Sequence, residues 1–323
     1  MSCLLLTPRF RTSRHVVFLV LPEGSSTPVL VAKAPRLRDD RVAIERESAT
    51  LRAAQEARPG GFDTIPRVVA LEDVHGWPLL VETALAGRPM SPAAVRRHPE
   101  RCIGAVLDWL AELPSIAFDA RDGEEGWYER LLADPLSRFA ARLPADGEEV
   151  RLVERTLEVL EPLRGAEVPL VLEHGDLSHP NLLVLESGRL GVLDWELAEL
   201  RGVPLADLCF FLAYAAFARR RAHTLERQLR AFDEAFVRPG AWAGRIVAEE
   251  ADRLAVPRRL AGLLFVACWP RYVLRLAERV EGDAGGPGLL DADTAAWLRG
   301  NRYSALWRHS LANACALEWA GGA

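Results

Sequence analysis

The sequence predicts an α+β fold with two lobes, a small β-rich N-lobe and a large, mainly helical C-lobe. Apolar runs of β-favouring residues dominate up to about residue 83, with one helical stretch between them. Helical periodicity dominates from residue 93 onward. Three short strand-like runs interrupt the helical part and enclose loops that contain His, Asp and Asn. We therefore expect an N-lobe over 1–83, a hinge over 84–92 and a C-lobe over 93–323.

Composition excludes several classes of protein. Half of the 323 residues are hydrophobic and 26% are charged, which is typical of globular domains and not of disordered chains. The net charge of −5 lacks the positive excess of a nucleic-acid-binding surface. The longest apolar runs, such as Leu208–Ala218, have eleven residues, whereas a membrane-spanning helix needs about 20. We predict a cytoplasmic protein that binds neither nucleic acid nor a membrane.

The N-lobe begins with a predicted hairpin. Two strand-like runs, 15–21 (HVVFLVL) and 28–34 (PVLVAKA), flank the polar loop Pro22–Thr27. A helical stretch follows over Asp39–Ala57. Two more strands are expected over Arg67–Leu71 and Leu79–Glu82. This order predicts a small antiparallel sheet with one helix.

The C-lobe alternates between helical and strand-like segments. Helices are expected over Ala93–Leu113, Trp127–Leu143 and Glu148–Leu163, strands over Leu170–Glu173, Leu182–Leu185 and Leu190–Leu193, and further helices after Pro204. The strands are therefore expected to hold the intervening polar loops within a helical framework.

A single lysine distinguishes one position in the N-lobe. Of the 40 basic residues, 39 are arginine and one is Lys33. Such a bias indicates that arginine replaces lysine wherever either residue will do. Lysine carries a compact ammonium group, whereas the guanidinium is a wide planar fork. Lys33 therefore marks a candidate functional site, and chance survival is the alternative.

The strand-like runs of the C-lobe frame two polar segments, His174–Asn181 (HGDLSHPN) and Val192–Glu196 (VLDWE). Asp176 lies five residues before Asn181, and Asp194 follows at the end of the next hairpin. A carboxylate together with an amide oxygen forms a hard-oxygen site suited to Mg²⁺. The other aspartate is available to accept a proton from a substrate hydroxyl.

These motifs resemble the catalytic and metal loops of the aminoglycoside phosphotransferase and choline kinase-like family. The resemblance covers residues from about 15 to 215 and implies a two-lobed protein-kinase-like fold. It implies ATP-dependent phosphorylation of a hydroxyl group on a small molecule. Asp176 would then be the catalytic base, and Asn181 and Asp194 would hold Mg²⁺.

The resemblance also implies a phosphate-binding lysine on the third strand and a glutamate on the following helix. Lys33 fits the first position, provided that one more strand precedes it, over Leu4–Phe10. Glu47 lies four residues before Leu51 and fits the second position better than Glu45, which is the alternative.

Two further parts of a nucleotide site are implied by the same resemblance. The loop residues Gly24, Ser25 and Ser26 would cover the phosphates, although one glycine makes this the weakest match. The segment Leu79–Pro89 resembles the hinge, where the backbone groups of Glu82, Thr83 and Ala84 would bind adenine.

The substrate class follows less directly from the sequence. Antibiotics, sugars, nucleosides and amino alcohols are all compatible, so a role in antibiotic resistance or in metabolism is open. A non-catalytic nucleotide-binding regulator and a protein Ser/Thr kinase are the alternatives. Between Arg201 and Val280 there are fourteen arginines and eight acidic residues. This balance predicts a neutral or weakly cationic substrate.

Side chains near these motifs have structural interpretations. We expect His174 to brace the catalytic loop and Asp207 to stabilise a loop or a helix N-terminus. Trp269 and Tyr272, near Arg271 and Arg275, are the better candidates for a substrate pocket.

Overall fold

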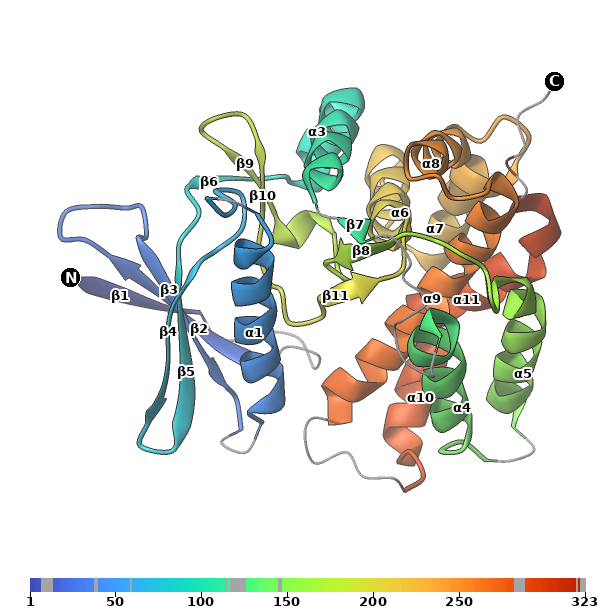
Figure 1. Ribbon diagram of the computed structural model, residues 1–323, viewed down its shortest axis with the longest axis horizontal. Coiled ribbons are helices and arrows are strands. Elements are labelled where there is room, and N and C mark those ends of the chain that lie inside the picture. The colour runs from blue at the N-terminus through green and yellow to red at the C-terminus, as the bar shows by residue number, and fades with distance from the viewer. Residues whose placement is uncertain are drawn as a thin grey trace.

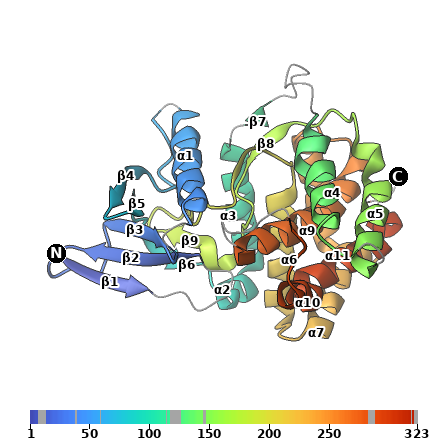
Figure 2. The same cartoon turned by 90° about the horizontal axis from the view of Figure 1, so that it is seen from below.

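The computed structural model shows the predicted two-lobed α+β fold (Figure 1). It describes residues 1–6, 14–37, 40–58, 60–113, 115–116, 126–144, 147–281, 288–317 and 319. A twisted sheet and helix α1 form one end of the molecule, and a helical body forms the other. The view from below shows the same separation (Figure 2).

The N-lobe is a five-stranded antiparallel sheet with the strand order β1-β2-β3-β5-β4. Its strands are β1 (Ser2–Leu6), β2 (His15–Leu21), β3 (Leu30–Pro35), β4 (Val68–Val74) and β5 (Trp77–Thr83). The predicted hairpin is confirmed, since Val17 pairs with Lys33 in the β2–β3 ladder. The extra first strand is present over Ser2–Leu6, whereas 7–10 lie outside the described residues. Lys33 is therefore on the third strand.

Helix α1 (Val42–Glu56) packs one face against this sheet. Ile44, Leu51 and Ala54 are fully buried, as expected for neighbours at helical spacing. Glu47 lies on the same face and is also fully buried. This burial of a carboxylate requires a partner, because an unpaired buried charge is costly.

A short strand lies within the segment that was expected to be only a hinge. Strand β6 (Gly87–Pro89) pairs with β9 (Leu182–Leu185). A Cβ atom at Gly87 would lie 2.8 Å from the carbonyl oxygen of Val184. The glycine therefore permits the chain leaving the N-lobe to approach the strand that follows the His174–Asn181 loop.

The helical body consists of α2 (Pro92–Arg97), α3 (Pro99–Glu112), η1 (Glu129–Ala133), α4 (Asp134–Ala140), α5 (Glu148–Leu160), η2 (Glu161–Leu163), α6 (Ala206–Arg220), α7 (Leu225–Phe232), η4 (Asp233–Val237), α8 (Trp242–Arg253), α9 (Arg258–Glu281), α10 (Ala292–Gly300), α11 (Arg302–Ala312) and η6 (Ala314–Leu317). The single helix predicted over Ala93–Leu113 is wrong. It is two helices, because His98 precedes Pro99 and takes a non-helical conformation with ψ 59°. The helix predicted from Trp127 contains a π-helical turn over Glu129–Ala133.

Small sheets in the C-lobe carry the polar loops. Strands β8 (Leu170–Glu173) and β9 match the prediction, and β10 (Leu190–Val192) ends one residue early. Strand β11 (Glu199–Gly202) was not predicted and pairs with β8, which also pairs with β7 (Ser115–Ile116). The turn η3 (His179–Asn181) joins the loop after β8 to β9. The polar loops thus lie between the N-lobe and the helices.

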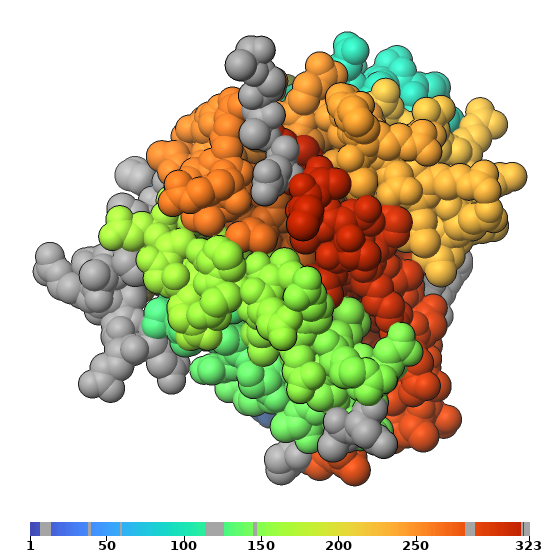
Figure 3. Space-filling view, turned by 90° about the vertical axis from the view of Figure 1, so that its right-hand side faces the viewer, coloured from blue at the N-terminus to red at the C-terminus, as the bar shows by residue number. Residues whose placement is uncertain are grey.

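Helix α9 is the central helix of the C-lobe. It is long and apolar enough to cross a membrane by length and composition, but its most apolar window is 89% buried inside the molecule. Core aromatic residues such as Phe232, Phe265 and Trp269 pack there. Figure 3 shows the face formed by C-lobe segments, with α5 beside the C-terminal helices. We therefore interpret α9 as a core helix.

Candidate active site

A buried ion cluster anchors the start of the polar loop. Glu173, the last residue of β8, accepts two hydrogen bonds of 2.8 Å from Arg271 and one of 3.0 Å from Arg275. It also accepts the backbone N–H of Val203 at 2.8 Å. Burial alone would raise the pKa of Glu173, but the two guanidinium groups lower it to about 2. Arg271 and Arg275, the neighbours of the pocket candidates Trp269 and Tyr272 in the sequence, thus hold this loop through Glu173.

The backbone of the next two residues is held by Asp207 at the start of α6. Its carboxylate accepts the N–H groups of His174 at 2.6 Å and Gly175 at 2.8 Å. Gly175 has φ 83°, and a Cβ atom there would lie 2.5 Å from the carbonyl oxygen of Leu197. Only glycine fits this position without a shift of the backbone. The expected loop-bracing role of Asp207 is confirmed.

His174 connects the two polar loops. Its Nε2 lies 2.9 Å from the carbonyl oxygen of Leu193, and its Nδ1 lies 3.3 Å from the backbone nitrogen of Asp176. These contacts define a neutral tautomer in which Nε2–H donates and Nδ1 accepts. Burial lowers the pKa of His174 to about 4, in agreement with a neutral ring. Both ring nitrogens are engaged, so His174 braces the loop and is not a base.

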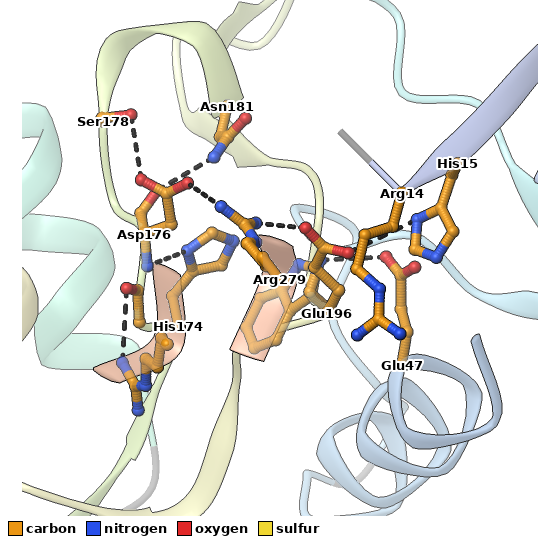
Figure 4. Close-up of polar contacts among 12 residues, drawn as sticks. Arg14, His15, Glu47, His174, Asp176, Ser178, Asn181, Glu196 and Arg279 are labelled. Carbon is orange, nitrogen blue, oxygen red and sulfur yellow. Dashed lines mark hydrogen bonds and ion pairs between the residues drawn. The ribbon is translucent and has the colours of Figure 1, made fainter. Parts of the chain in front are cut away.

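Asp176 is the carboxylate that the loop presents between the lobes (Figure 4). Its side chain is 13% exposed, and it lies 3.5 Å from Nη1 of Arg279. Ser178 donates a hydrogen bond of 3.3 Å to it. Burial raises the pKa of Asp176 to about 6, while Arg279 and the Tyr272 hydroxyl oppose the rise. At neutral pH this carboxylate is ionised and has a proton affinity suited to general-base chemistry.

Asn181 and Asp194 provide a hard-oxygen pair that fits Mg²⁺. Asn181 donates its amide Nδ2 to the carbonyl oxygen of Asp176 at 2.9 Å, so its Oδ1 remains available as a ligand. Asp194 has φ 66°, a left-handed conformation at the turn after β10. Within the described part of the chain, its carboxylate accepts no hydrogen bond. Burial would raise its pKa, but Lys33 and Arg279 lower it, so it is anionic.

Lys33 and Glu47 form the ion pair expected across the N-lobe. Nζ of Lys33 lies 2.6 Å from Oε1 of Glu47, and both side chains are buried. The same Oε1 accepts the backbone N–H of Trp195 at 2.9 Å. Glu47 therefore links Lys33 directly to the loop that carries Asp194. Glu45, the alternative, lies at an exposed position beside Arg41.

Glu82 is buried, and its side chain is a second partner of Lys33. Its Oε1 lies 3.1 Å from Nζ of Lys33. Only the backbone of Glu82 was expected to take part in the site. Glu82 shares the buried face of β5 with Pro78 and Leu80, so the two-residue period of a strand is the signal that could have located its side chain.

The backbone donors expected to bind adenine are partly occupied. The N–H of Thr83 donates to the carbonyl oxygen of Arg67, and the N–H of Ala84 donates to that of Val29, at 2.9 and 3.0 Å. These two groups are therefore not free donors in this structure. They instead tie the end of β5 and the start of the hinge to the residues just before β4 and β3, so an adenine donor would have to lie further along the chain.

The expected phosphate loop forms the exposed turn between β2 and β3. Gly24 has φ 75°, and Ser25 makes hydrogen bonds only within the turn, to Pro22 and Thr27, among the described residues. The structure does not bring Gly24, Ser25 or Ser26 into contact with the buried Lys33 group. Their role toward a nucleotide stays a prediction.

Glu196 and Arg279 form a buried ion pair that was not predicted from the sequence. Glu196 accepts a hydrogen bond from Nη2 of Arg279 and lies 3.5 Å from Nδ1 of His15 (Figure 4). Its carbonyl oxygen accepts two hydrogen bonds from Arg46. Arg279 thus bridges Glu196 and Asp176 and brings α9 into the site. Glu196 followed from the LDWE motif, but no local signal marks Arg279 or His15.

The two-lobed fold, the Lys33–Glu47 pair and the HGD loop together define the class of protein-kinase-like phosphotransferases. Residues 11–245 match the phosphotransferase enzyme family. The chain belongs to this family. No curated protein matches the sequence.

Solved structures share the fold at low sequence identity. An ethanolamine kinase of Plasmodium vivax has a TM-score of 0.58 and 11% identity, with 95% of this chain and 84% of that chain covered. The GDP complex of aminoglycoside 2'-phosphotransferase-IIIa has a TM-score of 0.50 and 15% identity, with 97% and 93% covered. The AMP complex of LicA, the choline kinase of Streptococcus pneumoniae, has a TM-score of 0.50 and 13% identity, with 97% and 93% covered. These similarities confirm the protein-kinase-like fold.

Proposed function

We propose that the protein is an ATP- and Mg²⁺-dependent phosphotransferase that phosphorylates a hydroxyl group of a small molecule. The observation that carries this proposal is the continuous link from Lys33 through Glu47 to the loop of Asp194. This link supports the proposal because it ties a cation suited to nucleotide phosphates to the loop that carries a carboxylate suited to a metal ion.

Each residue would have a separate task. Lys33 would bind the α- and β-phosphates, and Asn181 and Asp194 would hold Mg²⁺, which neutralises phosphate charge when bound. Asp176 would orient the acceptor hydroxyl and accept its proton. Arg279 keeps Asp176 ionised by its positive charge. Positioning and charge neutralisation supply most of the catalysis in phosphoryl transfer, so this set is sufficient.

The segment after Asp194 supports a small acceptor. Between Asp194 and Asp207 the chain forms β11, which pairs with β8 beneath the catalytic loop. This leaves no long activation segment of the kind that presents a protein substrate. The alternative, a non-catalytic nucleotide-binding regulator, is tested by assaying the wild-type protein against a panel of acceptors.

Replacement of Asp176 is the direct test. Asp176→Asn should lower turnover by about 10² to 10⁴, the span of general-base contributions, while ATP binding is retained. Phosphate transfer from labelled ATP is measured with a panel of antibiotics, sugars, nucleosides and amino alcohols. Asp252→Asn, at an exposed position paired with Arg258, is the control and should keep full activity. Wild-type turnover in Asp176→Asn would refute the assignment, and absence of transfer to every acceptor would favour the regulator.

A further inference from the structure

A group of aromatic side chains lies beside Asp176, on the side formed by the C-terminal helices. It consists of Tyr214 on α6, Tyr272 on α9, Tyr303 on α11, the neighbouring Arg302, and His179 of the catalytic loop. We refer to these five residues as the tyrosine–arginine cluster. The proposed catalytic tasks use none of them directly.

Contacts connect the cluster continuously to the catalytic carboxylate. The Tyr272 hydroxyl lies beside Asp176 and opposes the rise of its pKa. The rings of Tyr272 and Tyr303 are 4.4 Å apart, and the hydroxyl of Tyr303 hydrogen-bonds to that of Tyr214. The ring of Tyr214 lies 5.6 Å from His179, which returns to the catalytic loop. The cluster therefore forms a wall next to the place where an acceptor hydroxyl must lie.

Arg302 gives this wall an uncompensated positive charge. Its Nη2 donates to the hydroxyls of Tyr214 and Tyr303, with 2.7 Å to the latter. It forms no ion pair with any carboxylate of the described residues, and its Nε and Nη1 have no partner there. By contrast, Arg271 and Arg279 are both paired with glutamates. Arg302 is partly exposed and begins α11, where the helix dipole adds to its charge.

The same guanidinium blocks the cluster from binding a cation. Its Cζ lies 5.1 Å from the ring centre of Tyr214 and 4.7 Å from that of Tyr303. An aromatic cage for an ammonium group uses these ring faces, and here a cation of the protein already occupies them. His179 adds no negative charge, and the carboxylate beside the cluster, Asp176, already lies 3.5 Å from Nη1 of Arg279. A polyamine would therefore meet repulsion from Arg302 at this wall.

We propose that the acceptor carries a carboxylate, which binds the free Nε and Nη1 groups of Arg302, while its body packs on Tyr214 and His179. One free positive charge matches one negative charge, and a doubly charged phosphate would leave an excess beside Asp176. This inference rests on the proposed function and deepens it by specifying an anionic acceptor, in place of the neutral or weakly cationic one expected from the arginine count.

Binding of matched compounds tests the inference. Three series each supply an acid, a neutral compound and an amine on the same framework. They are glucuronate, glucose and glucosamine; glycerate, glycerol and 3-aminopropane-1,2-diol; and 4-hydroxyphenylacetate, 4-hydroxybenzyl alcohol and tyramine. Titration calorimetry with the full-length protein measures each affinity. In at least one series, the acid should bind about tenfold or more tightly than the amine, the range of a charge-assisted hydrogen bond.

Variants of Arg302 then test whether this arginine causes the preference for the acid. Arg302→Gln should weaken binding of the preferred acid about tenfold and change the neutral compound less than twofold. Arg302→Lys should restore part of the preference. Arg299→Gln, at an exposed position paired with Glu149, is the matched control. If Arg302→Gln fails to fold, salt titration of the wild type replaces it, since only the acid's affinity should fall with ionic strength.

The outcomes separate this inference from the proposed function. Preference for an amine, an acid preference that survives in Arg302→Gln, or no binding of any acid overturns the inference. Failure of the proposed function would appear differently, as an acid that binds through Arg302 but receives no phosphate from ATP.

Discussion

Replacement of Glu173 by glutamine tests how the catalytic loop is anchored. The native pKa of about 2 lies 2.5 units below the ordinary value of 4.5. At about 1.4 kcal/mol per pKa unit, this lowering of the pKa corresponds to about 3 to 4 kcal/mol of stability at neutral pH. Removal of one partner from a buried ion cluster typically costs about 3–5 kcal/mol, because the remaining charges stay unpaired. The lowered pKa and the typical cost of breaking a buried ion cluster give the same prediction. The free energy of unfolding of Glu173→Gln should be about 3 to 4 kcal/mol lower than that of the wild type, because Arg271 and Arg275 lose their carboxylate.

The pH dependence of this loss follows from the sign of the shift. A carboxylate with a lowered native pKa contributes its full stability above its unfolded pKa and loses it as the pH falls toward the native pKa. Glutamine does not titrate, so the free energy of unfolding of the wild type should exceed that of the variant by a constant amount above pH 5. This difference in free energy should decrease by about 1 kcal/mol between pH 5 and pH 3.5.

Urea unfolding followed by tryptophan fluorescence measures both effects. The control is Glu158→Gln, whose exposed pair with Arg155 has side-chain exposures of 65% and 67%. Such a surface pair contributes about 0–1 kcal/mol. The reasoning is refuted if Glu173→Gln unfolds at the same urea concentration as Glu158→Gln, or if its deficit does not depend on pH below pH 5.

Further predictions concern the residues around the nucleotide and the base. Lys33→Arg should lower activity with MgATP and leave the circular dichroism spectrum unchanged, because a planar guanidinium does not fit the place of the ammonium beside Glu47. Full activity of this variant would show that the single lysine is an accident of codon usage. Arg279→Gln should lower kcat by about 10- to 100-fold, because Asp176 loses its charged neighbour, and an effect confined to the KM for ATP would contradict this role. Asp207→Ala should speed hydrogen exchange at the backbone amides of 174 and 175 and reduce turnover, and unchanged exchange would contradict its bracing role.

Local patterns predicted the parts of the site that are close in sequence. The strands β8 and β9 have the predicted bounds because short apolar runs end there at polar loops. Glu47 was chosen from the family resemblance, because it lies four residues before Leu51. The structure buries both side chains. The motif spacing similarly located Asp176 and Asn181.

Long-range contacts were not predictable in this way. Arg279 reaches Glu196 across 83 residues, and nothing near it in the sequence distinguishes it from the other arginines. Strand β11 lacks an alternating apolar pattern, so pairing with β8 alone defines it. The N–H groups of Thr83 and Ala84 are occupied by backbone hydrogen bonds. Side-chain identity does not predict such bonds, so the sequence could not show that these donors are occupied.

Helix α9 limits how the chain can be divided. The family match ends at residue 245, before α9 begins at Arg258. Yet α9 supplies the guanidinium groups that compensate Glu173 and Glu196, both buried. A fragment that ends with the family match would therefore retain the complete HGD and LDWE motifs but leave their carboxylates uncompensated. We therefore expect that the segment matched by the family does not fold by itself, because the candidate site is completed only by the C-terminal helices.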